Sequence, residues 1–237
     1  MQLIGLIGGL SWESTAEYYR ILNRGAQAQL GGVHSARSLI YSFDFGEIEK
    51  LQHDGNWDAA DAAMVDAARR LERGGADFLI ICSNTMHRMA SAIEAAVKIP
   101  LLHIADPTGA AIKAAGLTRI GLLGTAFTME QPFYRQRLET RFALDVLTPN
   151  QEDRTIVHDI IYQELVKGIV RDQSRDRYRA VIERLIGAGA QAIILGCTEI
   201  MLLVGPADSA VPLFDTTTLH AEAALARALE RETAPSD

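Results

Sequence analysis

The chain of 237 residues contains one sequence pattern twice, and this duplication limits what it can fold into. Three pairs of segments match in the same order, at offsets of 116, 114 and 112 residues. They are IGLIGG (4–9) with IGLLGT (120–125), RLERGGADFLIICSNT (70–85) with RLIGAGAQAIILGCTE (184–199), and IPLLH (99–103) with VPLFD (211–215). An ordered series of this kind indicates two copies of one structural module.

Each copy alternates strand and helix patterns. A first strand ends in glycine, helical segments lead to a second buried strand, and a third strand opens on proline. Apolar residues follow helical spacing before both second strands. They are Ala60, Met64, Ala67 and Leu71 in the first copy, and Tyr178, Val181, Ile182 and Leu185 in the second. Near-continuous apolar strands alternating with helices predict an α/β fold of two pseudo-symmetric doubly wound lobes with mainly parallel sheets.

We predict that residues 1–105 plus 216–237 form the first lobe and residues 106–215 the second. The segment 106–117 is the expected crossover between the lobes, and a last helix over 217–230 is expected to return to the first. Ligands bind doubly wound sheets outside the carboxyl ends of the strands. Two related lobes bring those ends face to face, so the sequence predicts an active site in the cleft between them.

The charge pattern excludes several classes of partner. A net charge of −7 without a Lys/Arg block argues against nucleic acid and anionic membranes. No apolar run approaches the roughly eighteen residues of a membrane span, and the apolar start lacks the basic segment of a signal peptide. We therefore expect a cytoplasmic protein.

The two cysteines and six histidines show no metal-binding spacing, and we expect neither a metal site nor a disulfide.

The internal alignment places Ser83 opposite Cys197, and Cys82 opposite Gly196. Neighbouring strand residues point to opposite faces, so we expect Cys82 in the core and the Ser83–Cys197 pair facing the cleft. Two acid/base groups on opposite sides of one carbon suit removal of a proton from one face and its delivery to the other. Helix N-termini and loop amides are expected to lower the pKa of the thiol, so that a thiolate can act as base.

The most specific motifs of the chain are IGLIGGLSWEST, SNTMH and GCTEI. They carry a resemblance to the aspartate/glutamate racemase family, which extends over nearly the whole length of the chain. GGLSWEST together with SNTMH is similar to the broad-specificity amino-acid racemase branch. The resemblance implies a cofactor-independent isomerase, with no pyridoxal cofactor, whose small-molecule substrate is an amino acid, either aspartate and glutamate or a broader range. It puts the two catalytic positions on Cys197 and Ser83. The positions that it implies for holding the substrate are Leu10, Gln52, Asn84, Thr85, Thr125, Thr198 and Glu199.

Serine replaces the usual cysteine of the family at position 83, and a similar branch carries threonine there. A hydroxyl is a much poorer acid than a thiol, so we expect slow proton transfer on that face unless water or a neighbour relays it. The reaction could then be slow or absent. Some members of the family carry a lysine where Val166 stands here, which makes the adjacent Lys167 a poor candidate ligand. We expect His87 to be a supporting donor or a solvated helix residue rather than a base.

Two other functions fit the same residues. Members of the superfamily with one cysteine resemble arylmalonate decarboxylases, which protonate the carbanion left by loss of CO2. A non-catalytic amino-acid-binding protein would keep the cleft without the chemistry. A homodimer is the default expectation for assembly.

Overall fold

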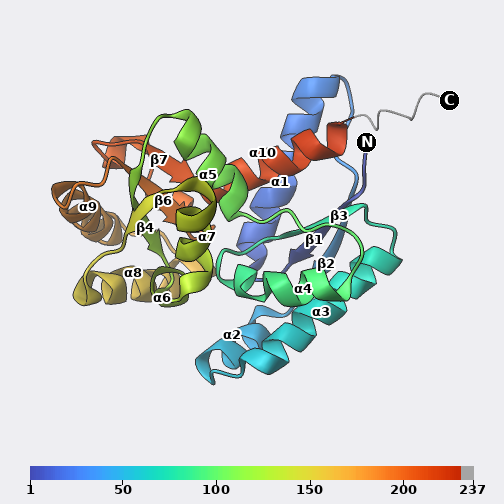
Figure 1. Cartoon of the computed structure of the whole chain (residues 1–237), viewed down its shortest axis with the longest axis horizontal. Coiled ribbons are helices and arrows are strands. Elements are labelled where there is room, and N and C mark those ends of the chain that lie inside the picture. Colours follow the sequence, from blue (N-terminus) through green and yellow to red (C-terminus); the bar gives the residue numbers. More distant parts are fainter. Residues whose placement is uncertain (231–237) are drawn as a thin grey trace.

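Two separate parallel sheets organise the protein, whose computed structural model describes residues 1–230 (Figure 1). The first sheet has the order β2-β1-β3 and the second the order β5-β4-β6-β7. The strands are β1 (Ile4–Gly8), β2 (Ser38–Ser42), β3 (Phe78–Ile81), β4 (Arg119–Gly124), β5 (Asp145–Leu147), β6 (Ala192–Gly196) and β7 (Leu213–Asp215). All their pairings are parallel. We call each sheet with the helices packed on it a lobe, and the predicted α/β class is confirmed.

Helices precede and follow the strands throughout the described chain. Those up to residue 114 are α1 (Trp12–Leu30), α2 (Phe45–His53), α3 (Trp57–Arg73), the 3-10 helix η1 (Thr85–Met89), α4 (Ala90–Ala96) and α5 (Ala105–Ala114). Those after it are α6 (Ala126–Glu130), α7 (Pro132–Phe142), α8 (Gln151–Gln163), α9 (Asp172–Gly187) and α10 (Thr216–Leu229), with 3-10 helices η2 (Leu165–Lys167), η3 (Ile200–Leu202) and η4 (Pro206–Asp208). None of the helices within residues 1–230 is long and apolar enough to cross a membrane.

The predicted helices before the second strands are confirmed as α3 and α9. Ala60, Met64 and Leu71 lie on the buried side of α3, and Tyr178 and Leu185 lie on that of α9. Each helix therefore covers its sheet with the apolar face that the periodicity indicated.

The two modules differ at their third strand. In the second copy the predicted strand forms β7, which is paired with β6. In the first copy the equivalent segment makes only an isolated parallel bridge, between Leu79 and Leu101. The Leu79 amide donates to the Pro100 carbonyl at 2.9 Å and the Leu102 amide to the Leu79 carbonyl at 2.9 Å. The third strand predicted for the first copy is therefore reduced to a single bridge, but this bridge occupies the equivalent position in the sheet.

The last helix, α10, packs beside α1 at the opposite end of the chain (Figure 1). Leu225 of α10 belongs to the same buried cluster as Tyr18 and Leu22 of α1. The last helix therefore packs on α1, while its assignment to the first lobe stays a prediction. The division of the chain into lobes at residues 105 and 216 stays a prediction. Residues 231–237, which were assigned to the first lobe, lie outside the described part of the chain.

Candidate active site

One pocket is lined from both lobes, next to the carboxyl ends of β3 and β6. Ser83 follows β3 and Cys197 follows β6, and both side chains contribute to the lining. The space between its lining atoms is about 360 Å3, including space open to solvent. The remaining predicted ligand positions also line it. They are Leu10, Gln52, Asn84, Thr85, Thr125, Thr198 and Glu199.

Glycines let the backbone approach closely at the strand ends. Gly9 has φ +72°, and a Cβ atom there would lie 2.3 Å from the Phe43 backbone nitrogen. At Gly196, which lines the pocket, a Cβ atom would lie 2.7 Å from the Leu123 carbonyl oxygen. Neither contact is tolerable for a larger residue, so glycine is required at both strand ends.

The residues after β3 have different environments. Cys82 is fully buried in the first lobe's core, as predicted, and burial raises the pKa of its thiol. Ser83 turns toward the pocket and is 8% exposed. The Met86 amide lies 3.4 Å from its Oγ atom, which it approaches as a donor. The strand alternation therefore separates an inert thiol from an accessible hydroxyl.

Cys197 donates a hydrogen bond from its thiol to Glu199, with 2.9 Å between Sγ and Oε2. The same oxygen accepts from the Thr198 hydroxyl at 2.9 Å. The other carboxylate oxygen accepts from Ser11 Oγ at 2.5 Å, across the boundary between the lobes. Glu199 is thus a buried acceptor that joins the N-cap of α1 to the end of β6.

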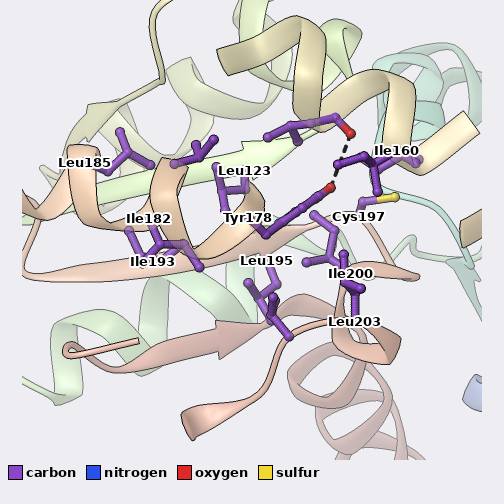
Figure 2. Close-up of a cluster of buried hydrophobic side chains, with 14 of the residues drawn as sticks. Leu123, Ile160, Tyr178, Ile182, Leu185, Ile193, Leu195, Cys197, Ile200 and Leu203 are labelled. Atoms are coloured by element: carbon purple, nitrogen blue, oxygen red, sulfur yellow. Dashed lines mark hydrogen bonds between the residues drawn. The ribbon is translucent and has the colours of Figure 1, made fainter. Parts of the chain in front are cut away.

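The surroundings of Cys197 raise the pKa of its thiol well above the ordinary value. Burial is the largest cause, followed by the negative charge of Glu199 and the hydrogen bond to it. Figure 2 shows Cys197 at one end of the second lobe's apolar cluster, near Ile160 and Ile200. The backbone amides of Thr198 and Glu199 lower the pKa but do not outweigh these causes. The expectation that loop amides give this cysteine a low pKa is therefore wrong, because its surroundings favour the protonated thiol.

Asn84 presents a buried acceptor without a partner. Its Nδ2 atom donates to Thr216 Oγ1 at 2.9 Å, and the Thr216 hydroxyl donates in turn to the Leu195 carbonyl at 2.9 Å. The hydroxyl proton is used in the second bond, so the amide orientation is fixed. The Oδ1 atom of Asn84 then has no hydrogen-bond partner among residues 1–230. A buried acceptor in this state can accept from a donor on a ligand or from water.

Three threonine hydroxyls form a cluster across the lobes. Thr85 Oγ1 lies 2.9 Å from Thr125 Oγ1 and 3.3 Å from Thr128 Oγ1, and the last two lie 3.2 Å apart. Thr125 is also the N-cap of α6, because its side chain accepts from the Thr128 amide. The cluster places neutral hydroxyl donors beside a helix N-terminus, where a carboxylate is favoured.

His87 and Lys167 do not line the pocket. The Nδ1 atom of His87 donates to the Ser83 carbonyl at 2.6 Å, and its Nε2 atom accepts from the Ile104 amide at 3.1 Å. Both ring nitrogens are occupied, and burial lowers the pKa of His87 well below its ordinary value. His87 thus supports the backbone of Ser83, whereas Lys167 is exposed on η2.

Sequence reasoning missed several residues that line the pocket. They are Phe45 of α2, Ile161 and Tyr162 of α8, Val166 of η2 and Gly196 of β6. One signal for Val166 exists: the offset of 114 residues that aligns the second strands pairs it with Gln52. Tyr162 donates from its hydroxyl to Gln52 Oε1 at 2.8 Å, which closes this side of the pocket between the lobes.

The donors around the pocket are mainly hydroxyls, amides and one carboxylate. Within the described residues, no group of three or more His, Cys, Asp or Glu side chains is placed to hold a metal ion.

Comparisons with known proteins agree with this architecture. The family model described as Asp/Glu/Hydantoin racemase matches residues 7–224. RacX of Bacillus subtilis (strain 168), a broad specificity amino-acid racemase, is 24% identical over 232 residues, which are 93% of this chain and 95% of RacX.

Two solved structures are also similar. A crystal structure of an Asp/Glu racemase candidate from Yersinia pestis is 53% identical, with a TM-score of 0.90 and coverage of 97% of this chain and 100% of that one. An aspartate racemase homologue from Pyrococcus horikoshii OT3 is 30% identical, with a TM-score of 0.83 and the same coverage.

Proposed function

Because the chain belongs to the Asp/Glu/Hydantoin racemase family, we propose that it is a cofactor-independent amino-acid racemase that inverts the Cα centre of a substrate held between its lobes. One observation carries the proposal. Ser83 and Cys197, which the internal duplication aligns, line the same pocket from different lobes. Groups on two sides of one carbon can exchange its proton with inversion.

The amino acid's charged groups have partners in this pocket. The ammonium group would donate to Asn84 Oδ1, the buried acceptor that lacks a partner among the described residues. The α-carboxylate would accept from the hydroxyls of Thr85 and Thr125 and from amides at the N-terminus of α6. These contacts would also stabilise the extra negative charge on the carboxylate when the α-proton leaves.

Cys197 and Glu199 would act together on one face. Glu199 accepts the thiol proton, the thiolate removes the α-proton, and the Cα–H electron pair is delocalised into the carboxylate. The substrate's ammonium charge favours this step, because it offsets the negative charge that raises the pKa of the thiol. The reverse sequence delivers a proton from the Cys197 thiol to Cα.

Ser83 would serve the opposite face. Its hydroxyl, directly or through a water molecule, donates a proton to the carbanion and then recovers one from solvent, while Glu199 releases to solvent the proton that it took from the thiol. A neutral hydroxyl is a weak acid, so this transfer is the slower one. The equilibrium constant for inversion of one centre is one, and the slow face therefore lowers kcat/KM equally for both enantiomers.

The test follows deuterium incorporation at Cα in D2O by NMR, and inversion by chiral chromatography, over a panel of L- and D-amino acids. Cys197→Ala should abolish exchange. Cys82→Ala is the matched control, because it removes a thiol of the same strand-end type that lies in the core rather than in the pocket.

Equal exchange by the parent and Cys197→Ala would overturn the assignment of Cys197. Binding of amino acids without any exchange would indicate the non-catalytic alternative. Release of CO2 from an arylmalonate in the same assay would indicate the decarboxylase alternative.

A further inference from the structure

The proposed reaction leaves one proton on Glu199 at each turnover. Cys197 becomes a thiol again when it takes the α-proton, so the proton that it first gave to Glu199 is still on that carboxyl group when the product forms. Ser83, on the opposite face, has given one proton away. Glu199 must therefore release its proton before the same enantiomer can react again, and the product then occupies the pocket that Glu199 lines.

Glu199 also lines a second hollow, which we call the α1 groove. The other residues of its lining include five on α1 and one on η3, which are Glu13, Ser14, Ala16, Glu17, Arg20 and Leu202. The space between the lining atoms is about 590 Å3, including space open to solvent. Ala16 and Arg20 are exposed, so water reaches this groove from the surface.

The groove and the pocket share a partition. Of the residues that the structure describes, only Thr198 and Glu199 line both hollows. Both are buried, with 4% and 3% of their surface exposed. The two hollows therefore meet at the residues that follow Cys197 in the chain.

The hydroxyl of Thr198 contacts the oxygen of Glu199 that faces the thiol. Thr198 Oγ1 lies 2.9 Å from Glu199 Oε2, and Cys197 Sγ lies 2.9 Å from the same oxygen. While Glu199 is a carboxylate, the threonine hydroxyl is the donor. Once Oε2 carries a proton the roles reverse, because a hydroxyl oxygen also has lone pairs that accept.

Ser11 has a different role at the other oxygen of Glu199. Its hydroxyl donates to Oε1, and it is the N-cap of α1. Ser11 is 1% exposed and lines neither the pocket nor the groove. It holds the carboxylate beside the positive end of α1, which favours the charged form of Glu199. Thr198 is thus the hydroxyl partner of Glu199 that reaches the groove.

The charges along the groove favour movement of a proton away from Glu199. Glu13 and Glu17 contribute two carboxylates to the lining, and Arg20, which pairs with Glu17, contributes one cation. The remaining excess of negative charge attracts protons toward the opening of the groove.

We propose that Thr198 relays the proton from Glu199 to water in the α1 groove, so that proton release does not pass through the substrate pocket. Thr198 Oγ1 accepts the proton held on Glu199 Oε2 and gives its own hydroxyl proton to a water molecule. Glu199 becomes a carboxylate again and Thr198 stays neutral. Ser83 takes up one proton from solvent, so the enzyme returns to its starting state without net gain or loss.

The inference rests on the proposed function, and its test compares the first turnover with later ones. With enzyme in excess, quench flow and chiral chromatography measure inversion in the first turnover, which requires no proton release. With amino acid in excess, the same analysis measures repeated turnover, which requires it. Both use the L-amino acid that exchanges fastest in D2O, and a Ser83→Cys background, so that slow transfer at position 83 does not hide the release step.

Ala16→Phe fills the groove with a side chain from an exposed position of α1. It should slow repeated turnover about tenfold and leave the first turnover unchanged, because only release is obstructed. Ala28→Phe is the matched control. Ala28 is exposed on the same helix but lines neither the groove nor the pocket, so this variant should change neither rate.

Thr198→Val removes the relay hydroxyl and keeps the branched shape of the side chain. It should lower the ratio of repeated to first-turnover rates about tenfold, and Thr198→Ser should restore this ratio because serine retains the hydroxyl. A change in substrate binding alone would not lower the ratio when both rates are measured at saturation.

Unchanged ratios in Ala16→Phe and Thr198→Val would overturn the inference and leave the proposed function intact. An equal fall of both rates in these variants would indicate a structural role and would also overturn it. A lower ratio in Ala16→Phe alone would overturn the assignment of Thr198. Absence of inversion in the first turnover, with Ser83 and with Ser83→Cys, would overturn both the proposed function and the inference.

Discussion

The thiol of Cys197 and the carboxylate of Glu199 share a hydrogen bond of 2.9 Å inside a pocket that both lobes line. The sulfur is the donor in this bond and carries the proton. Reactivity at this face depends on the Glu199 carboxylate accepting that proton, and on a substrate charge that makes the transfer favourable.

Glu199→Gln should lower the pKa of the Cys197 thiol and slow racemisation by about 100-fold. Removal of the negative charge takes away the second-largest cause of the raised pKa, whereas burial remains. Alkylation by iodoacetamide as a function of pH, in a Cys82→Ala background, measures this shift directly. The exposed Glu222→Gln is the control. An alkylation profile unchanged by Glu199→Gln would contradict the coupling.

Ser83→Cys should increase the rate of inversion, because a thiol is a far better acid than a hydroxyl near neutral pH. Ser83→Ala should retain α-proton exchange for one enantiomer but lose most inversion, since only Cys197 remains. Chiral chromatography alongside NMR separates the two effects. The double variant Ser83→Cys/Cys197→Ala should reverse which enantiomer exchanges; unchanged preference would show that the two residues do not act on opposite faces.

Thr216→Val should raise KM about tenfold with little effect on kcat. The hydroxyl of Thr216 fixes the Asn84 amide so that Oδ1 is the free acceptor, and valine removes this constraint. The loss of a buried hydrogen bond also costs about 1 kcal/mol of stability. Thr216→Ser keeps the hydroxyl and should restore KM. A fall in kcat with KM unchanged would point to a purely structural role.

Acid should destabilise the protein through three buried histidines. The rings of His87, His103 and His220 lie together. The ring centroid of His87 is 4.5 Å from that of His103 and 5.6 Å from that of His220. Burial is the main cause that lowers the pKa of all three, to about 2 for His103 and about 4 for His220. Their neutral forms are stable in the folded state, whereas the unfolded chain takes up protons below its histidine pKa of about 6.5.

The contribution of these histidines to the free energy of unfolding should therefore be constant above pH 7 and fall below about pH 6.5, by about 1.4 kcal/mol per pH unit for each such histidine. For His220 the fall continues to about pH 4, and for His103 to about pH 2. Urea unfolding between pH 7.5 and 4.5 measures the slope. His103→Gln should reduce this slope by about 1.4 kcal/mol per pH unit, because one proton fewer is taken up on unfolding. His34→Gln, at an exposed position, should leave the slope unchanged. An identical slope in both variants would refute this origin.

The sequence predicted the site residues at strand ends better than those on helices. Ser83 and Cys197 follow strands whose glycines and apolar runs repeat at a fixed offset, so the amino-acid sequence alone aligns these two candidate positions. Tyr162 and Phe45 lie on amphipathic helices, and periodicity shows which face is buried but not whether it meets a sheet or the other lobe.

Two further features could not be predicted because they depend on three-dimensional surroundings. The high pKa of Cys197 arises from burial against Tyr178 and Ile160 and from the nearby Glu199 carboxylate. The third strand of the first copy has the proline and apolar residues of its counterpart, yet pairs at only one residue, Leu101.

The position of α10 against α1 has a consequence for synthesis of the chain. Tyr18 and Leu22 are translated well before the helix that shields them, which contacts them through Leu225. The nascent polypeptide thus carries an unprotected apolar surface until α10 has been made, a state in which chains are prone to aggregate or to recruit chaperones.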